Sequence, residues 1–179
     1  MKVLVLNGSP HANGCTARAL KEIIDTLQQE GVVCQLLHIG KDAVHGCVSC
    51  GYCNKNDRCI FDNDKVNEAA KLFETADGLI IGSPVYYGSP NGAALAFMDR
   101  LFYSTGFDKH MKVCAAVVSC RRGGNTASFD VLNKYLPSPG CRWCPAPTGT
   151  RCTASPPRMW RRISRGCRPC ATLPGTWPS

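Results

Sequence analysis

The feature that most constrains this chain is a fourfold alternation of apolar runs, glycine-containing loops and helical patterns along residues 2–134. The first apolar run, at residues 2–7, is continuous, which is typical of a strand buried on both faces of a sheet. The helical stretches repeat apolar residues three and four positions apart. This alternation predicts a parallel sheet covered by helices on both faces, with ligands bound at the carboxyl ends of the strands.

The elements can be assigned to residue ranges. The strands are expected at 2–7, 32–39, 78–82 and 113–119, and the helices at 17–30, 64–76, 93–103 and 126–134. The sequence therefore predicts a three-layer α/β fold whose loops after the first, third and fourth strands carry the chemistry.

The cysteine content bears on the cellular setting. Thirteen of the 179 residues are cysteines, which could suggest a secreted disulfide scaffold. However, the first strand follows the initial methionine without a signal-peptide pattern, and no apolar run approaches the length of a membrane span. We therefore expect a cytoplasmic protein without a membrane partner, in which clustered cysteines are metal ligands or redox thiols.

The loop from Gly8 to Thr16 joins the first strand to a helix. Its hydroxyls, its flexible backbone and the helix N-terminus together favour binding of an anion such as a phosphate. The loop has neither the Walker lysine nor a G-x-G-x-x-G pattern, which argues against nucleoside triphosphate and dinucleotide sites. An ordinary strand–helix turn with a Ser or Thr cap is the alternative.

A second loop, from Gly82 to Gly92, is rich in Pro, Tyr and Gly. Tyr86 and Tyr87 are adjacent at the end of a buried strand, among residues that expose the backbone. They can cover an aromatic ring and hydrogen-bond its polar edge. The alternative is a structural loop whose tyrosines lie at the surface.

Taken in order, these loops resemble those of the NADPH-dependent FMN reductase branch of the flavodoxin-like superfamily. The resemblance covers residues 1–135 and implies a flavodoxin-like doubly wound sheet in the order 2-1-3-4. We expect the fifth strand of that sheet to be lost, because the chain beyond residue 135 departs from the pattern. It implies that the FMN phosphate is bound by Ser9, Asn13, Gly14, Cys15 and Thr16. It implies that the isoalloxazine ring is contacted by Ser83, Pro84, Val85, Tyr86, Tyr87 and Gly88. The third flavin loop, at the pyrimidine edge, is matched by Ser119, Arg121, Gly123 and Gly124.

The resemblance also implies an activity. FMN accepts a hydride at N5 and passes electrons on singly or in pairs, so NAD(P)H is the expected donor and a small molecule or protein the acceptor. No catalytic side-chain acid or base is expected; Arg121 or Arg122 near the ring would favour the reduced flavin anion. By resemblance we expect a homodimer or homotetramer. The alternative is a non-catalytic metal- or redox-sensing protein on the same scaffold.

Four cysteines follow the second strand with compact spacing: Cys47, Cys50, Cys53 and Cys59. Four thiolates this close can hold a [4Fe–4S] cluster, whereas a zinc ribbon separates its two cysteine pairs by a longer gap. The spacing resembles that of the iron–sulfur flavoproteins of the same superfamily, in which the cluster passes electrons to FMN. A zinc site, redox-sensing thiols and a solvated turn are the alternatives. Cys34, Cys114 and Cys120 are expected to be buried core thiols.

Residues 136–179 do not fit the pattern of residues 1–135. Beyond position 136 the chain carries seven Arg and no acidic residue, and nine of its twelve prolines. The pairs Cys141/Cys144 and Cys167/Cys170 could belong to a zinc-bearing nucleic-acid module, or the segment could be a disordered basic tail. The segment has few aliphatic residues for a core, which argues against such a module. We favour a shifted reading frame. Nucleic acid is therefore not an expected partner.

The reading-frame hypothesis predicts the result of sequencing the gene again. Back-translation with one base restored yields a strand-like segment and then an amphipathic helix, the elements that this family places next. We expect independent sequencing across codon 136 to recover that frame. An unbroken frame in an independent isolate would overturn the hypothesis. The chain as written is expected to be poorly stable, because a sheet edge and an apolar face lose their cover.

Overall fold

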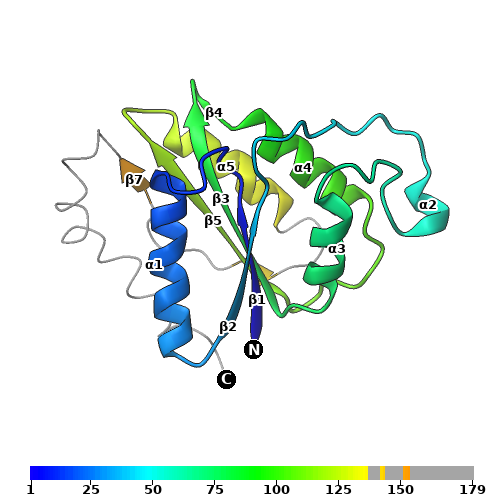
Figure 1. Cartoon of the computed structure of the whole chain (residues 1–179), viewed down its shortest axis with the longest axis horizontal. Helices are drawn as coiled ribbons and strands as arrows, with labels where there is room; N and C mark the ends of the chain where they lie inside the picture. Colours follow the sequence, from blue (N-terminus) through cyan, green and yellow to red (C-terminus); the bar gives the residue numbers. More distant parts are fainter. Residues whose placement is uncertain (137–141, 144–150, 154–179) are drawn as a thin grey trace.

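The computed structural model describes residues 1–136, 142–143 and 151–153 (Figure 1). The strands are β1 Lys2–Asn7, β2 Val33–His38, β3 Gly78–Tyr86, β4 Ser89–Pro90, β5 Val113–Cys120, β6 Arg142–Trp143 and β7 Arg151–Thr153. The helices are α1 Cys15–Gln29, α2 Cys53–Asn56, α3 Val66–Glu74, α4 Gly92–Tyr103 and α5 Asn125–Tyr135. The four long strands and four long helices match the sequence expectation within a few residues at each end.

The long strands lie parallel in the order β2-β1-β3-β5. Since β5 is the fourth strand expected from the sequence, the predicted order 2-1-3-4 is confirmed. The intervening β4 was not expected: it is a two-residue strand that folds back antiparallel on the end of β3. Its effect is to turn the second loop, residues 82–92, back toward the carboxyl edge of the sheet.

The prediction of a lost fifth strand needs correction. Two short strands pair in parallel with β5 on its outer side, β6 near its start and β7 near its end. They span two and three residues, against eight in β5. Pairing of this kind uses backbone N–H and C=O groups, which every non-proline residue offers whatever its side chain. The other residues beyond 136 lie outside the described part, so the expectations for their cysteines and prolines stay predictions.

The core consists of two layers, one on each face of the sheet. Alternate residues of β1 point to opposite faces: Val3 and Val5 pack under α1. Leu4 and Leu6 pack under α3, α4 and α5. Figure 1 shows α1 alone on its side among the described helices and the other three long helices together. Burial on both faces explains why the strand sequences are continuous apolar runs.

Phe73 lies at the centre of the larger layer. Its ring is fully buried and meets Phe102 and Phe107 edge-on, with ring centroids 5.9 and 5.4 Å apart. We expect Phe73→Ala to lower the free energy of unfolding by about 3–5 kcal/mol, since burial is lost and a cavity remains. Urea denaturation measures this change. The control Val33→Ala, at an exposed edge position, should change it by less than about 0.5 kcal/mol; equal losses would contradict this core assignment.

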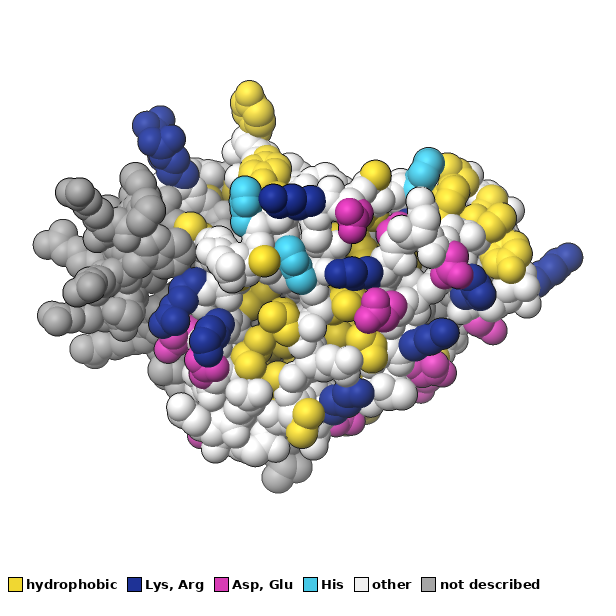
Figure 2. All heavy atoms as spheres, in the orientation of Figure 1, with side chains coloured by type: hydrophobic (Ala, Val, Ile, Leu, Met, Phe, Trp, Pro, Cys, Tyr) yellow, Lys and Arg dark blue, Asp and Glu magenta, His cyan; other side chains and the backbone are white. Residues whose placement is uncertain are grey.

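Charges of both signs are interspersed on the visible face of the described part (Figure 2). Arg18–Glu22 and Lys21–Asp25 pair one turn apart along α1. Residues 1–136 are nearly neutral, with 14 Lys and Arg against 13 Asp and Glu. In the part of the chain that the structure describes, no helix is both long and apolar enough to cross a membrane.

Candidate functional site

The first and third loops meet at the carboxyl edge of the sheet. The hydroxyls of Thr16 and Ser119, 103 positions apart in sequence, are buried and hydrogen-bonded at 2.7 Å. The first and second loops are also joined, because the Gly8 N–H donates to the Gly82 carbonyl at 2.7 Å. These bonds bring the predicted phosphate loop together with the ends of β3 and β5.

The second and third loops touch at Gly124. A Cβ added there would lie 2.7 Å from the Tyr87 carbonyl oxygen and 2.8 Å from the Gly88 Cα. Gly124 also has a φ of +80°, in the left-handed region that favours glycine. All three predicted loops thus form one continuous rim, and glycine is required where the second and third loops touch.

Helix α1 begins at this rim with unsatisfied donors. Its cap residue, Gly14, has no side chain to cap the first-turn N–H groups, which are therefore available to an anion. Burial raises the pKa of the Cys15 thiol, so this side chain stays neutral beside such an anion at physiological pH. Asn13 is exposed next to them. The geometry suits a phosphate group.

Ser9 differs from the other residues of the phosphate loop. It is buried, and its hydroxyl accepts from the His11 N–H at 3.1 Å. Its own N–H donates to the Asn7 side chain at 3.0 Å. Ser9 therefore holds the loop in shape from its buried side, and its hydroxyl can still donate one hydrogen bond and accept another.

The residues predicted to contact a flavin ring divide into two groups. Tyr86 is half-exposed and Tyr87 fully exposed, with a φ of +59° at Tyr87; Gly88 is exposed beside them. Pro84 and Val85 are half-buried. Ser83 instead is buried, and its hydroxyl bonds the Asn91 N–H and the Pro84 carbonyl, so it holds the loop in shape.

On the third loop, Ser119 is buried and its hydroxyl is engaged with Thr16. Arg121, Arg122 and Gly123 are exposed at the same rim. The sequence grouped all the third-loop residues as contacts, whereas the structure separates a buried support from an exposed edge.

Two residues that the sequence did not single out hold the rim. Asn91 donates to the Gly8 carbonyl at 3.0 Å and accepts from the Ala93 N–H at 3.0 Å, so it ties the first loop to the second and caps α4. The ring Nε2 of His38 is 2.8 Å from the Ser9 carbonyl oxygen. An Asn directly before a helical pattern is a recognised cap signal and could have been noticed; the His38 contact had no sequence signal.

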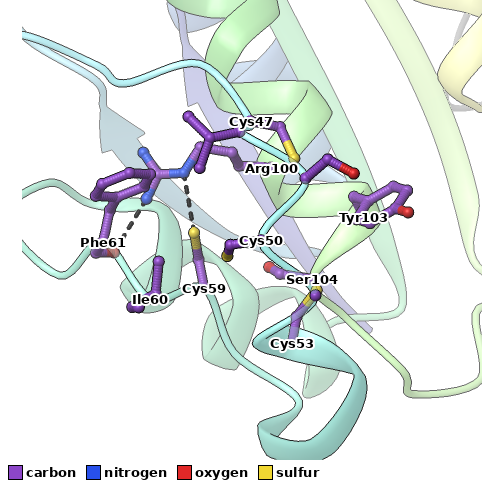
Figure 3. Close-up of a pocket in the computed structure, with 12 residues that line it drawn as sticks. Cys47, Cys50, Cys53, Cys59, Ile60, Phe61, Arg100, Tyr103 and Ser104 are labelled. Atoms are coloured by element: carbon purple, nitrogen blue, oxygen red, sulfur yellow. Dashed lines mark hydrogen bonds between the residues drawn. The ribbon is translucent and has the colours of Figure 1, made fainter.

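The four predicted metal ligands line one pocket (Figure 3). Cys47 and Cys50 are exposed, Cys53 is half-buried and begins the short helix α2, and Cys59 is buried. We call residues 45–64, which contain them, the cysteine loop. Its chain bends sharply at three residues of positive φ: Ser49, Gly51 and Asp57. Two of these are not glycine, and such strain collects at functional sites.

The four cysteines of this pocket are of the ligand type that both zinc ions and iron–sulfur clusters use. In the described part of the chain, no three Cys, His, Asp or Glu side chains converge on a point where one metal ion could bind. A [4Fe–4S] cluster takes four thiolates, one for each iron, so its ligands surround a larger volume. Four sulfur donors line this pocket, which is the number and type of ligand that such a cluster takes.

Behind the cysteines lies a buried arginine that was not among the predicted site residues. Arg100 of α4 is 1% exposed, and its Nε–H donates to the Cys59 Sγ at 3.1 Å. Its guanidinium also forms an ion pair with the buried Asp64 carboxylate.

Of the expected core thiols, Cys114 and Cys120 are buried, whereas Cys34 is half-buried on β2.

Comparison with known proteins shows the family of this chain. The family model of NADPH-dependent FMN reductase matches residues 1–146. An iron–sulfur flavoprotein of Methanocaldococcus jannaschii is 30% identical over 139 residues, which cover 76% of this chain and 72% of that protein. An iron–sulfur flavoprotein of Clostridioides difficile is 31% identical over 133 residues, covering 72% of this chain and 59% of that protein.

Solved structures show the same fold at low sequence identity. The apo form of an NADH:FMN oxidoreductase superposes with a TM-score of 0.70 at 20% identity, covering 99% of this chain and 90% of that one. A flavodoxin from the domain Archaea gives a TM-score of 0.64 at 15% identity, covering 98% and 97%. These likenesses confirm the flavodoxin-like fold. The family match over residues 1–146, more than half of the chain, establishes that this chain belongs to the NADPH-dependent FMN reductase family.

Proposed function

We propose that this protein is an FMN-dependent NAD(P)H oxidoreductase that carries a [4Fe–4S] cluster on its cysteine loop. The observation that carries the proposal is the continuous rim made by three loops at the carboxyl edge of the sheet. Its strongest links are the Thr16–Ser119 hydrogen bond and the close approach of Gly124 to Tyr87 and Gly88. Parallel sheets of this kind bind their ligands at that edge.

The residues of the rim take separate roles in this proposal. The uncapped N–H groups at the start of α1 bind the flavin phosphate, assisted by Asn13. Thr16 supports the loop through its hydrogen bond to Ser119. Tyr86 and Tyr87 lie along the ring, and Gly123 and Gly124 present backbone to its pyrimidine edge. Bound FMN supplies the hydride and single-electron chemistry, so the side chains are needed for binding and orientation. Arg121 is exposed at the same rim, and its positive charge favours the anionic form of the reduced flavin.

The cysteine loop supplies the second redox site. Its four thiolates hold the irons, and the bound cluster exchanges single electrons. The relatives that match this chain are named iron–sulfur flavoproteins, which supports this part of the proposal. Cys47, Cys50, Cys53 and Cys59 are free thiols, which supports a reducing cytoplasmic setting.

Further parts of the proposal concern the limits of the domain and its partners. We assign the flavin domain to residues 1–135, a homodimer or homotetramer as the assembly, and a small molecule or protein as the electron acceptor. The near-neutral charge of residues 1–136 and the mixed signs in Figure 2 give no extended positive surface for nucleic acid on the visible face.

Spectroscopy of anaerobically purified protein tests the proposal. We expect flavin bands with a broad brown shoulder, and about four irons per chain when acid-released iron is counted on the same sample. Steady NAD(P)H oxidation with a quinone or free flavin as acceptor should accompany them. Flavin without iron would leave a simple FMN reductase. Bound cofactors without turnover would favour a sensing protein, and a colourless sample would overturn the flavin assignment.

A further inference from the structure

We propose that Arg100 is the positioning residue of the four-cysteine pocket. It fastens both ends of the cysteine loop to helix α4, and it donates a hydrogen bond to the Cys59 sulfur that shifts the redox equilibrium of the bound cluster. The inference rests on the proposed cluster and adds to it, because Arg100 lies outside the cysteine motif, 41 positions from Cys59.

Arg100 contacts the cysteine loop on both sides of the cysteines. Figure 3 shows its bonds to Cys59 and Phe61. On the near side, its Nη1–H donates to the His45 carbonyl at 3.3 Å, two residues before Cys47. On the far side, its Nη2–H donates to the Phe61 carbonyl at 3.0 Å, two residues after Cys59. One planar side chain thus joins the start and end of the loop, which the rigid fork of a guanidinium does better than an ammonium.

The ion pair with Asp64 offsets the free-energy cost of burying the positive charge of Arg100. Both side chains are nearly inaccessible to solvent, at 1% and 3% exposure. The Asp64 carboxylate accepts from two guanidinium nitrogens and also from the Val66 N–H, at the start of α3. A buried charge without such a partner would be strongly destabilising. The pair therefore fixes the guanidinium in one orientation, with its Nε–H directed at the sulfur.

Anchoring the cysteine loop to α4 does not by itself require the hydrogen bond from Arg100 to the Cys59 sulfur. Cys59 is the buried member of the four cysteines, so its ligand charge is screened least by water. Hydrogen bonds to cluster sulfurs are among the features that set the reduction potential. A donor at Cys59 stabilises the more negative, reduced state, and its removal should lower the potential.

The test uses full-length holoprotein purified without oxygen, with three variants. Arg100→Lys keeps a positive charge near Asp64 but cannot direct donors to Asp64 and Cys59 together. The double variant Arg100→Gln/Asp64→Asn removes the ion pair without leaving a buried carboxylate unpaired. Arg58→Lys is the matched control, since Arg58 precedes Cys59 but pairs with Asp62 at the exposed surface.

Three quantities are measured: iron per chain, the midpoint potential of the cluster, and the rate of trypsin cleavage at Lys55 in the loop. For Arg100→Lys we expect at least a tenfold shift toward the oxidised cluster, which is about 59 mV for a one-electron couple. We also expect faster cleavage at Lys55 in both Arg100 variants. Flavin content should be unchanged, and the control should match the unmodified protein in all three quantities.

The outcomes distinguish the role of Arg100 from the presence of the cluster. Unmodified protein without iron would refute the cluster, and the inference with it, before any variant is compared. Clusters with unchanged potential in both Arg100 variants would overturn the inference and leave the cluster standing. Loss of iron from both variants, with flavin retained and the control intact, would support the anchoring role.

Discussion

Replacement of Cys50 by serine is expected to remove nearly all iron from the protein while leaving its FMN in place. Cys50 is exposed in the four-cysteine pocket, so its loss takes away a ligand without opening a cavity in the core. A [4Fe–4S] cluster needs four ligands, and thiolates are those that iron–sulfur sites use. The measurement is iron and flavin per chain, with the absorption spectrum of the same anaerobic sample.

Cys34→Ser is the matched control for this experiment. Cys34 is a free, half-buried thiol on β2, so the same atom is exchanged outside the cysteine loop. We expect it to keep both cofactors. Full iron content in Cys50→Ser would show that Cys50 is not a ligand. Loss of iron from both variants would point to damage to the fold rather than to the pocket.

A large loss of FMN affinity is expected when Gly124 is replaced by alanine. Gly124→Ala places a methyl group against the Tyr87 carbonyl and the Gly88 Cα, at 2.7 and 2.8 Å in the unrelaxed backbone. These are backbone atoms, so relief requires the second and third loops to separate. Because 1.4 kcal/mol corresponds to a factor of ten in affinity, even a modest displacement should weaken FMN binding by roughly tenfold or more. Fluorescence titration of the apoprotein with FMN measures the change.

Gly31→Ala separates this collision from the cost of the backbone conformation. Gly31 has a φ of +78°, close to the +80° of Gly124, but a Cβ there meets no atom within 4 Å. Both variants therefore incur left-handed strain of about 1–2 kcal/mol in folding stability. Only Gly124→Ala should lose FMN affinity. Equal affinities in the two variants would exclude the contact of the two loops as a determinant of flavin binding.

The order of the main elements and the identity of the loops were predictable from the sequence. Apolar runs and helical spacing are local patterns, so strands such as β1 and helices such as α1 could be located without knowledge of their neighbours. The glycine loops at Gly8 and Gly82, and the four close cysteines, were equally visible. The strand order followed from the family resemblance that these loops carry.

Only the tertiary structure showed which side chains support the site and which face a ligand. Thr16 and Ser119 were both predicted contacts, but their hydroxyls bond each other across 103 positions. Arg100 is one of two adjacent charged residues in an otherwise apolar helix, yet it is buried between the two ends of the cysteine loop. A local pattern reports periodicity along the chain, whereas burial and hydrogen-bond partners depend on segments distant in sequence. The sequence by itself therefore determined the fold and the position of its functional loops, and the packing of those loops decided the role of each residue.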